Sequence, residues 1–239
     1  MIKSFKKSNQ VYGEFNHGEI IENKPIGFPQ DNGQLKPYSN LFYWAHAIAK
    51  KDSTIGLHPH RGFEIMTIVL EGKIKHYDTL LSKWIPLDKG DVQLIQSRSG
   101  ISHAETLLKE SRIFQIWFQP DLRKALHKAP NYLDVRKEEL PQTDEMTTIV
   151  GHEAPFKLDA ENIEVSLHHQ KNNTYHLQVD ANYYYSIYLI EGKLKINQVH
   201  FQTDDFFVIS QESSINYEVL QESHFLCIKS PINISYPIY

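Results

Sequence analysis

The chain has 239 residues, of which 41% are hydrophobic and 23% charged, so it can bury a core and is not of the disordered class. Twenty-five basic against 29 acidic residues give a net charge of −4, which argues against a nucleic-acid binder. The longest apolar stretch, residues 41–49, is far shorter than the roughly 20 residues of a membrane span. A basic N-terminus without a following apolar segment and a single cysteine, Cys227, predict a cytoplasmic protein without disulfides.

Short runs of β-branched and aromatic residues, separated by turn residues, follow one another along the chain and predict an all-β protein. A helix is expected only at residues 120–126. Many short strands with little helical periodicity are typical of a barrel or sandwich. The predicted strands cover residues 65–70, 73–77, 91–95, 113–118 and 183–190.

Two of these segments recur later in the chain. Residues 69–75 (VLEGKIK) return 120 positions later as residues 189–195 (LIEGKLK). Residues 91–95 (DVQLI) are matched 114 positions later by residues 205–209 (DFFVI). Because both matches occur in the same order, the sequence predicts two similar β domains, residues 1–136 and 137–239, joined at the polar, proline-containing start of the second.

Two pairs of potential metal ligands lie in the first predicted domain. His58 and His60 are two residues apart, as are His103 and Glu105. Residues at this spacing project from the same face of a strand. If the two pairs face one another inside a barrel, they offer three imidazole nitrogens and one carboxylate oxygen. Such a set suits Fe(II), Mn(II), Ni(II), Co(II) or Cu(II) and leaves coordination positions open for a substrate.

The segments around these residues resemble the pirin family, which belongs to the cupin superfamily of small β-barrels. The resemblance is carried by HPHRGFEIMTIVLEG at residues 58–72, KHYD at 75–78, GDVQ at 90–93 and GISHAE at 100–105. It implies two tandem cupin-type (jelly-roll) barrels, a bicupin. It also implies that His58, His60, His103 and Glu105 hold one divalent metal, Fe(II) in the family, with Ni, Co, Mn, Cu or Zn as alternatives.

The resemblance further implies quercetin 2,3-dioxygenase activity, in which a flavonol or similar enolic aromatic reacts with O₂ and its heterocycle is opened. Glu105 would then act as ligand and proton acceptor. Two other hypotheses remain open: a redox-sensitive, metal-binding regulator that docks on a protein partner, and a bicupin whose metal only stabilises the fold. A cavity ringed by Phe and Met would favour the enzyme. No membrane or direct nucleic-acid partner is expected.

The second domain is predicted to lack metal ligands. Shifting the four candidate ligands by the repeat distances leads to Gln178, Asp180, Tyr217 and Val219, none of which is a histidine. Among other polar residues, Arg98 is expected at the pocket rim and Arg61 pointing away from the metal. His76 and Asp78 are expected to decorate a strand, and the adjacent His168 and His169 to face opposite sides of one.

Overall fold

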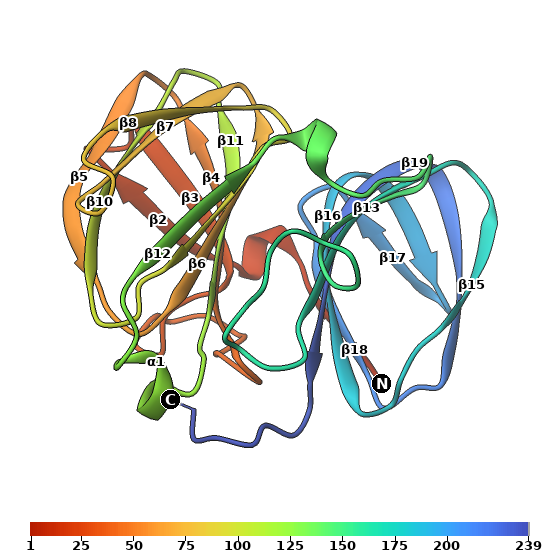
Figure 1. Cartoon of the computed structure of the whole chain (residues 1–239). Coiled ribbons are helices and arrows are strands. Elements are labelled where there is room, and N and C mark those ends of the chain that lie inside the picture. Colours follow the sequence, from red (N-terminus) through yellow and green to blue (C-terminus); the bar gives the residue numbers. More distant parts are fainter. Residues whose placement is uncertain (239) are drawn as a thin grey trace. The chain divides into compact units, whose positions relative to one another are not determined.

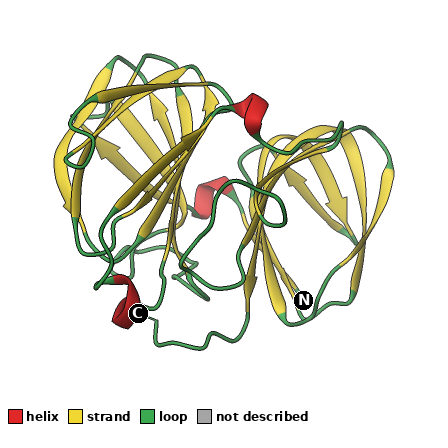
Figure 2. Ribbon diagram, in the orientation of Figure 1, coloured by secondary structure: helices red, strands yellow, loops and turns green. Residues whose placement is uncertain are grey.

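A computed structural model describes residues 1–238, and strands dominate it (Figure 2). The chain divides into two compact units, each built around its own sheets. The N-terminal barrel comprises Gln10–Glu139, with Leu158–Glu161 and the residues from 236. The C-terminal barrel comprises Met1–Asn9, Leu140–Lys157 and Asn162–Ser235. Within residues 1–238, no helix has the length and apolar character needed to cross a bilayer.

The N-terminal barrel consists of a four-stranded and a seven-stranded antiparallel sheet (Figure 1). The smaller sheet has the order β5-β10-β7-β8, and the larger sheet β12-β9-β6-β11-β4-β3-β2. The strands of the smaller sheet are β5 (Ser53–His60), β7 (Lys73–Asp78), β8 (Trp84–Asp88) and β10 (Ile101–Leu107). Those of the larger sheet are β2 (Val11–Phe15), β3 (Ile20–Ile26), β4 (Leu41–Ala49), β6 (Glu64–Glu71), β9 (Val92–Gln96), β11 (Arg112–Phe118) and β12 (Asn131–Val135).

Strand alternation sorts the inward-facing residues of this barrel into layers. At one end, apolar side chains from both sheets form a closed cluster, here called the base layer. Two residues further along each strand, polar side chains replace them: Gln115 follows Ile113 on β11, and Glu105 precedes Leu107 on β10. The two sheets therefore pack together through apolar side chains at the base, and polar side chains line the interior above this layer. The base layer contains Ile20, Ala47, Ala49, Val69, Ile74, Leu87, Leu107 and Ile113.

The C-terminal barrel is a single eight-stranded sheet with the path β1-β18-β16-β19-β14-β13, to which β15 and β17 are attached. Its first strand, β1, pairs with β18, so the N-terminal residues 1–9 lie in this barrel and not in the domain that the sequence assigned them to. Lys6 strengthens this attachment through an ion pair of 2.7 Å with buried Asp205. The strands are β1 (Ile2–Phe5), β13 (Met146–Val150), β14 (Glu164–Gln170), β15 (Thr174–Gln178), β16 (Tyr183–Ile196), β17 (Val199–Gln202), β18 (Phe206–Ser210) and β19 (Ser214–Pro231).

The helical segments are short. They are α1 (Leu122–Ala125), within the predicted segment 120–126, and two 3₁₀ turns, η1 (Lys7–Asn9) and η2 (Lys137–Glu139). Asp121 caps α1 by accepting a hydrogen bond from the Arg123 amide. In the C-terminal barrel, Cys227 is buried, and burial raises the pKa of its thiol to about 12, which makes the thiol unreactive.

The sequence repeat corresponds to a repeated turn. Gly72 and Gly192 both have positive φ, and each packs against a serine, Ser111 in one barrel and Ser223 in the other. Each serine hydroxyl accepts a hydrogen bond from the amide that follows the glycine, at 3.0 Å in the first barrel and 3.1 Å in the second. Only glycine provides both the left-handed backbone and the space for the serine.

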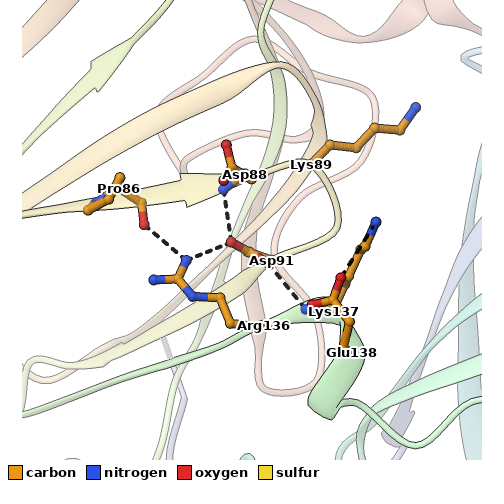
Figure 3. A pocket seen from close by; sticks show the side chains of 7 residues that line it. All are labelled: Pro86, Asp88, Lys89, Asp91, Arg136, Lys137 and Glu138. Atoms are coloured by element: carbon orange, nitrogen blue, oxygen red, sulfur yellow. Dashed lines mark hydrogen bonds and ion pairs between the residues drawn. The ribbon is translucent and has the colours of Figure 1, made fainter.

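Asp91 and Asp205, which begin the matched segments 91–95 and 205–209, make the same contact in the two barrels. Asp91 accepts a hydrogen bond of 2.8 Å from the Asp88 amide, and Asp205 one of 2.9 Å from the Gln202 amide. Around Asp91, the Arg136 side chain adds an ion pair of 2.6 Å at the edge of a cavity of about 320 Å³ (Figure 3). Asp91 also accepts a hydrogen bond of 3.2 Å from the Lys137 amide, so it joins the β8–β9 turn to the segment after β12.

The segment 158–161 folds onto the N-terminal barrel. Buried Glu64 accepts hydrogen bonds of 2.7 Å from the Asp159 and Ala160 amides. Arg98 forms an ion pair of 2.9 Å with Asp159 and donates to Gln96. Arg98 therefore fastens this segment, and the expectation that it reaches the pocket rim is wrong.

Candidate metal centre

Three imidazole rings converge inside the mouth of the N-terminal barrel. The ring centroids of His58, His60 and His103 lie 4.4, 4.7 and 4.8 Å apart, which makes a nearly equilateral triangle. Their potential ligand nitrogens all lie within 4.8 Å of one another. The two tripeptides that the sequence singled out therefore face one another across two neighbouring strands.

The register of β5 and β10 explains this convergence. His58 is the direct partner of His103, and His60 is the partner of Ile101, one step further along the ladder. His58 and His60 share one face of β5 because they are two residues apart. A register shift between His103 and Glu105 then changes the pairing, so that Glu105 is opposite Ile55.

Three nitrogens of this triangle have no hydrogen-bond partner in residues 1–238. They are Nε2 of His60 and both ring nitrogens of His103, all buried. Burial and the nearby His103 and His58 rings lower the pKa of His60 to about 3. Burial and the nearby His58 and His76 rings lower the pKa of His103 to about 3 as well. Neutral imidazoles with unpartnered lone pairs are what a transition metal requires, so the residues fit such an ion.

His58 is oriented by its own strand. Its Nδ1 donates a hydrogen bond of 2.7 Å to the carbonyl oxygen of Gly56. With the proton on Nδ1, the lone pair lies on Nε2, which is the arrangement by which a backbone carbonyl usually orients a metal-binding histidine.

Glu105 is fully buried and connects the two sheets. Its Oε2 accepts a hydrogen bond of 2.7 Å from Gln115 on β11. Its Oε1 accepts bonds from Gln93 on β9, at 3.1 Å, and from Thr67 on β6, at 3.3 Å. The carboxylate groups with His103 and His76, not with His58 and His60, so the four predicted residues form two overlapping clusters that share His103.

The buried neighbours of this centre were not predicted from the sequence. His76 and Asp78 are both fully buried and joined by a hydrogen bond of 2.8 Å, so they do not simply decorate a strand. The His76 ring stacks on Tyr132 at 4.5 Å. Another buried carboxylate, that of Glu22 on β3, accepts hydrogen bonds of 3.2 and 3.3 Å from the Tyr43 hydroxyl. Burial raises the pKa of Glu22 to about 7, against the opposing effect of Lys24.

A cavity of about 470 Å³ reaches His60 from the surface. Its volume lies in the range of small-molecule sites, about 300–1,000 Å³. It is lined by Pro59, His60, Arg61, Thr79, Gly100, Ile101 and Ser102. The ring of Phe and Met that would favour the enzyme is absent from this lining. Arg61, expected to point away, contributes to it.

Aromatic residues nevertheless lie behind the site. Trp117 meets the His60 ring edge-on at 4.8 Å. Phe63 and Tyr43 contact Trp117 at 5.6 and 5.3 Å. These residues are half-buried or buried and support His60 from the larger sheet.

The equivalent interior of the C-terminal barrel is apolar. Leu107 pairs with Ile74 in the first barrel, and Val219 pairs with Leu194 in the second. Because Ile74 corresponds to Leu194 in the repeat, Leu107 corresponds to Val219, so the sequence offset at this strand is 112 positions and not 114. The counterparts of Glu105 and His103 are then Tyr217 and Ile215, and those of His58 and His60 are Leu177 and Val179. The sequence predicted different counterparts, but neither set contains a histidine.

Comparison with known proteins identifies both barrels. Residues 24–118 match the Pirin family, and residues 155–229 match the quercetinase C-terminal cupin domain. A Pseudomonas aeruginosa protein, PA1210, provisionally named a quercetin 2,3-dioxygenase, is 29% identical over 91% of this chain and 95% of its own. The quercetin 2,3-dioxygenase of Escherichia coli is 24% identical over 95% of this chain and 97% of its own.

The fold agrees with these matches. The crystal structure of the bacterial pirin YhhW from Escherichia coli, in complex with nickel(II), superimposes with a TM-score of 0.82 at 23% identity. The match covers 97% of this chain and 99% of YhhW. Both the predicted resemblance and the predicted two-barrel all-β fold are confirmed: the chain belongs to the pirin family of bicupins.

Proposed function

We propose that His58, His60, His103 and Glu105 hold one divalent transition metal in the N-terminal barrel. The observation that carries this proposal is the group of buried imidazole nitrogens without a hydrogen-bond partner among residues 1–238. A buried unpartnered polar group costs about 1–3 kcal/mol. Each ring can supply one nitrogen to an ion, so the unpartnered nitrogens of the adjacent His60 and His103 rings are best explained by a metal that both rings bind.

The donor set favours Fe(II), Ni(II), Mn(II), Co(II) or Cu(II) over a closed structural zinc site, which would use cysteines. The nickel(II) complex of YhhW supports an ion of this group. Fe(II) is our first choice and Ni(II) the alternative. When bound, such an ion would supply direct binding of dioxygen and of an oxygen-bearing substrate.

We further propose that the protein is a quercetin 2,3-dioxygenase-like enzyme acting on a flavonol or similar enolic aromatic. The names of the two relatives above support this reaction class. In this reaction, Glu105 takes the proton of the substrate hydroxyl, because it is a carboxylate beside His103. Gln115, Gln93 and Thr67 hold it in place by donating to both of its oxygens.

Arg61 is proposed to attract the substrate. Its exposed side chain lines the same cavity as His60. The other residues that line this cavity carry no charge, since burial keeps the His60 imidazole neutral, so Arg61 gives the opening a positive charge. An enolate or phenolate is attracted by such a charge, whereas a cationic substrate is repelled.

The test is to remove all metal, reload the protein anaerobically with each of the five ions, and add quercetin and oxygen. We expect loss of the flavonol absorbance and release of carbon monoxide with one ion at least. His103→Ala should abolish both the turnover and the bound metal of the N-terminal barrel. Turnover that persists in His103→Ala would exclude this centre as the active site.

The same experiment separates the enzyme from its alternatives. If the N-terminal barrel retains one ion but no ion supports turnover, the metal-binding regulator becomes the better description. A metal that raises only the melting temperature, and changes neither turnover nor partner binding, would instead favour a purely structural role.

A further inference from the structure

A second group of metal-binding side chains lies in the C-terminal barrel, on strands β14 and β19. His169 and His224 are direct partners across these two strands. Their rings stack at 4.2 Å with an angle of 12°. Glu222 precedes His224 by two residues on β19, and its Oε1 accepts a hydrogen bond of 2.5 Å from Nε2 of His169. Three potential ligands therefore converge from two adjacent strands.

The positions of these side chains are set by the sheet. β19 is paired with β14 on one side and with β16 on the other, so the backbone that carries Glu222 and His224 is held from both sides. The neighbouring His168 projects to the opposite face, where it stacks on Phe225 at 4.7 Å. His169 therefore acts without His168, as the sequence predicted, but it is joined by a histidine 55 positions later.

The group is accessible to a dissolved ion. The side chains of His169 and Glu222 are 39% and 56% exposed. The potential ligand atoms of the three residues lie within 4.8 Å of one another. Exposed side chains need only small rotations to bring them to the roughly 2 Å metal–ligand distances of an imidazole and carboxylate site.

The charges around the group favour a cation. On the other side of His224, its partner on β16 is the exposed residue Glu191, which adds a second carboxylate to the same face. Lys171, one residue beyond β14, is the opposing charge in the sequence around His169. The two carboxylates outweigh the charge of Lys171, and the two imidazoles add nitrogen ligands.

We propose that His169, Glu222 and His224 form a surface site for Zn²⁺. Two imidazoles and one carboxylate, with water in the fourth position, are an established tetrahedral zinc set. An isolated ion pair between His169 and Glu222 would need no third partner. The cross-strand His224 is what turns the pair into a chelating site. This inference is independent of the reaction proposed above, because none of the three residues belongs to the N-terminal barrel.

The test is a Zn²⁺ titration of the metal-free, full-length protein, followed by heteronuclear NMR and calorimetry. We expect amide signals of residues 167–171 and 220–225 to shift together, separately from any response of residues 56–60 and 101–105. His224→Ala should weaken Zn²⁺ binding at the first group of signals at least about tenfold, since losing only an outer-shell partner already costs about 10–100-fold. His200→Ala, which removes an exposed histidine of the same barrel, should leave the titration unchanged.

Glu222→Gln guards against a folding defect in the histidine variant, because it keeps the size and polarity of the side chain. It should also weaken Zn²⁺ binding at β14 and β19. The proposal is overturned if Zn²⁺ leaves the signals of residues 167–171 and 220–225 unchanged. It is equally overturned if Glu222→Gln and folded His224→Ala titrate like the wild type. Either result can be interpreted whether or not the N-terminal barrel binds Zn²⁺, because the signals of residues 56–60 and 101–105 report that centre separately.

Discussion

Gln115 Nε2 donates a hydrogen bond of 2.7 Å to Oε2 of Glu105, across the interior of the N-terminal barrel. This contact joins β11 of the larger sheet to β10 of the smaller sheet. It fixes the carboxylate beside His103, which our proposal makes a metal ligand. Mutation of a residue that orients a ligand in this way typically lowers metal affinity about 10–100-fold.

We predict that Gln115→Leu lowers the metal affinity of the N-terminal barrel about 10–100-fold. Leucine has a similar volume but cannot donate a hydrogen bond, so Glu105 loses its shortest contact. Competition with a chromogenic chelator measures the change. Gln30→Leu, at an exposed loop residue, is the control and should bind metal like the wild type. An unchanged affinity in Gln115→Leu would show that Gln115 does not orient the ligand.

The Glu22 carboxyl should make folding pH-dependent in the metal-free protein. Burial raises its pKa to about 7, above the value of 4.5 for an unfolded chain. Between these values the folded state binds more protons than the unfolded state, so this group's stabilisation is full below pH 4.5 and is lost as the pH rises towards 7. The difference corresponds to about 3 kcal/mol at most.

Glu22→Gln should therefore flatten the pH dependence, because glutamine can still accept from the Tyr43 hydroxyl and carries no charge. Urea unfolding at pH 5 and pH 8, compared with the wild type, measures the effect. Glu14→Gln is a matched control, since exposed Glu14 also accepts a hydrogen bond from a tyrosine, Tyr12, at 2.8 Å. If both variants change the pH dependence equally, the buried carboxyl is not its cause.

The turn glycines should not tolerate a side chain. At Gly72, a Cβ would lie 2.6 Å from the Ser111 Oγ, and the φ of +74° is unfavourable for alanine. We expect Gly72→Ala to lower the free energy of unfolding by at least about 1–2 kcal/mol. Gly56→Ala provides the control, because no atom lies within 4 Å of its added Cβ. Equal free energies of unfolding for the two variants, measured with urea, would show that the turn does not require glycine at position 72.

Arg61→Gln should raise the KM for an anionic substrate about three- to fivefold and leave kcat nearly unchanged, because an exposed charge contributes up to about 1 kcal/mol. The effect should shrink as the salt concentration rises. Steady-state kinetics at two ionic strengths measure both. Lys83→Gln removes an exposed positive charge that does not line the cavity and should have no comparable effect. A lower kcat with unchanged KM would contradict an attracting role.

Much of the fold could be predicted because it is encoded locally. The β-branched runs became β6, β9 and β11, and the repeated glycine turns occur in both barrels. The HxH spacing put two imidazoles on one strand face. The partners of Glu105 could not be predicted, because they come from β6, β9 and β11 and meet only in the folded barrel. Their only local signal is a polar residue within each apolar run: Thr67, Gln93 and Gln115.

The prediction of which residues of the second barrel correspond to the metal ligands was wrong for a related reason. A constant shift assumes loops and strands of equal length, but the second barrel is two residues shorter between the strand that begins at Val92 and the end of β10. The register shift between His103 and Glu105 adds a further local difference. Such changes alter which residues face inward, and strand pairing is needed to see them.

The apolar base layer of the N-terminal barrel has a consequence for how molecules enter and leave the site. Apolar side chains fill the far end, and the described cavity between Pro59 and Ser102 gives a molecule access to His60 from the surface. A product that leaves through this cavity takes the path by which the next substrate arrives. At high substrate concentration, incoming substrate would then compete with outgoing product for the same cavity.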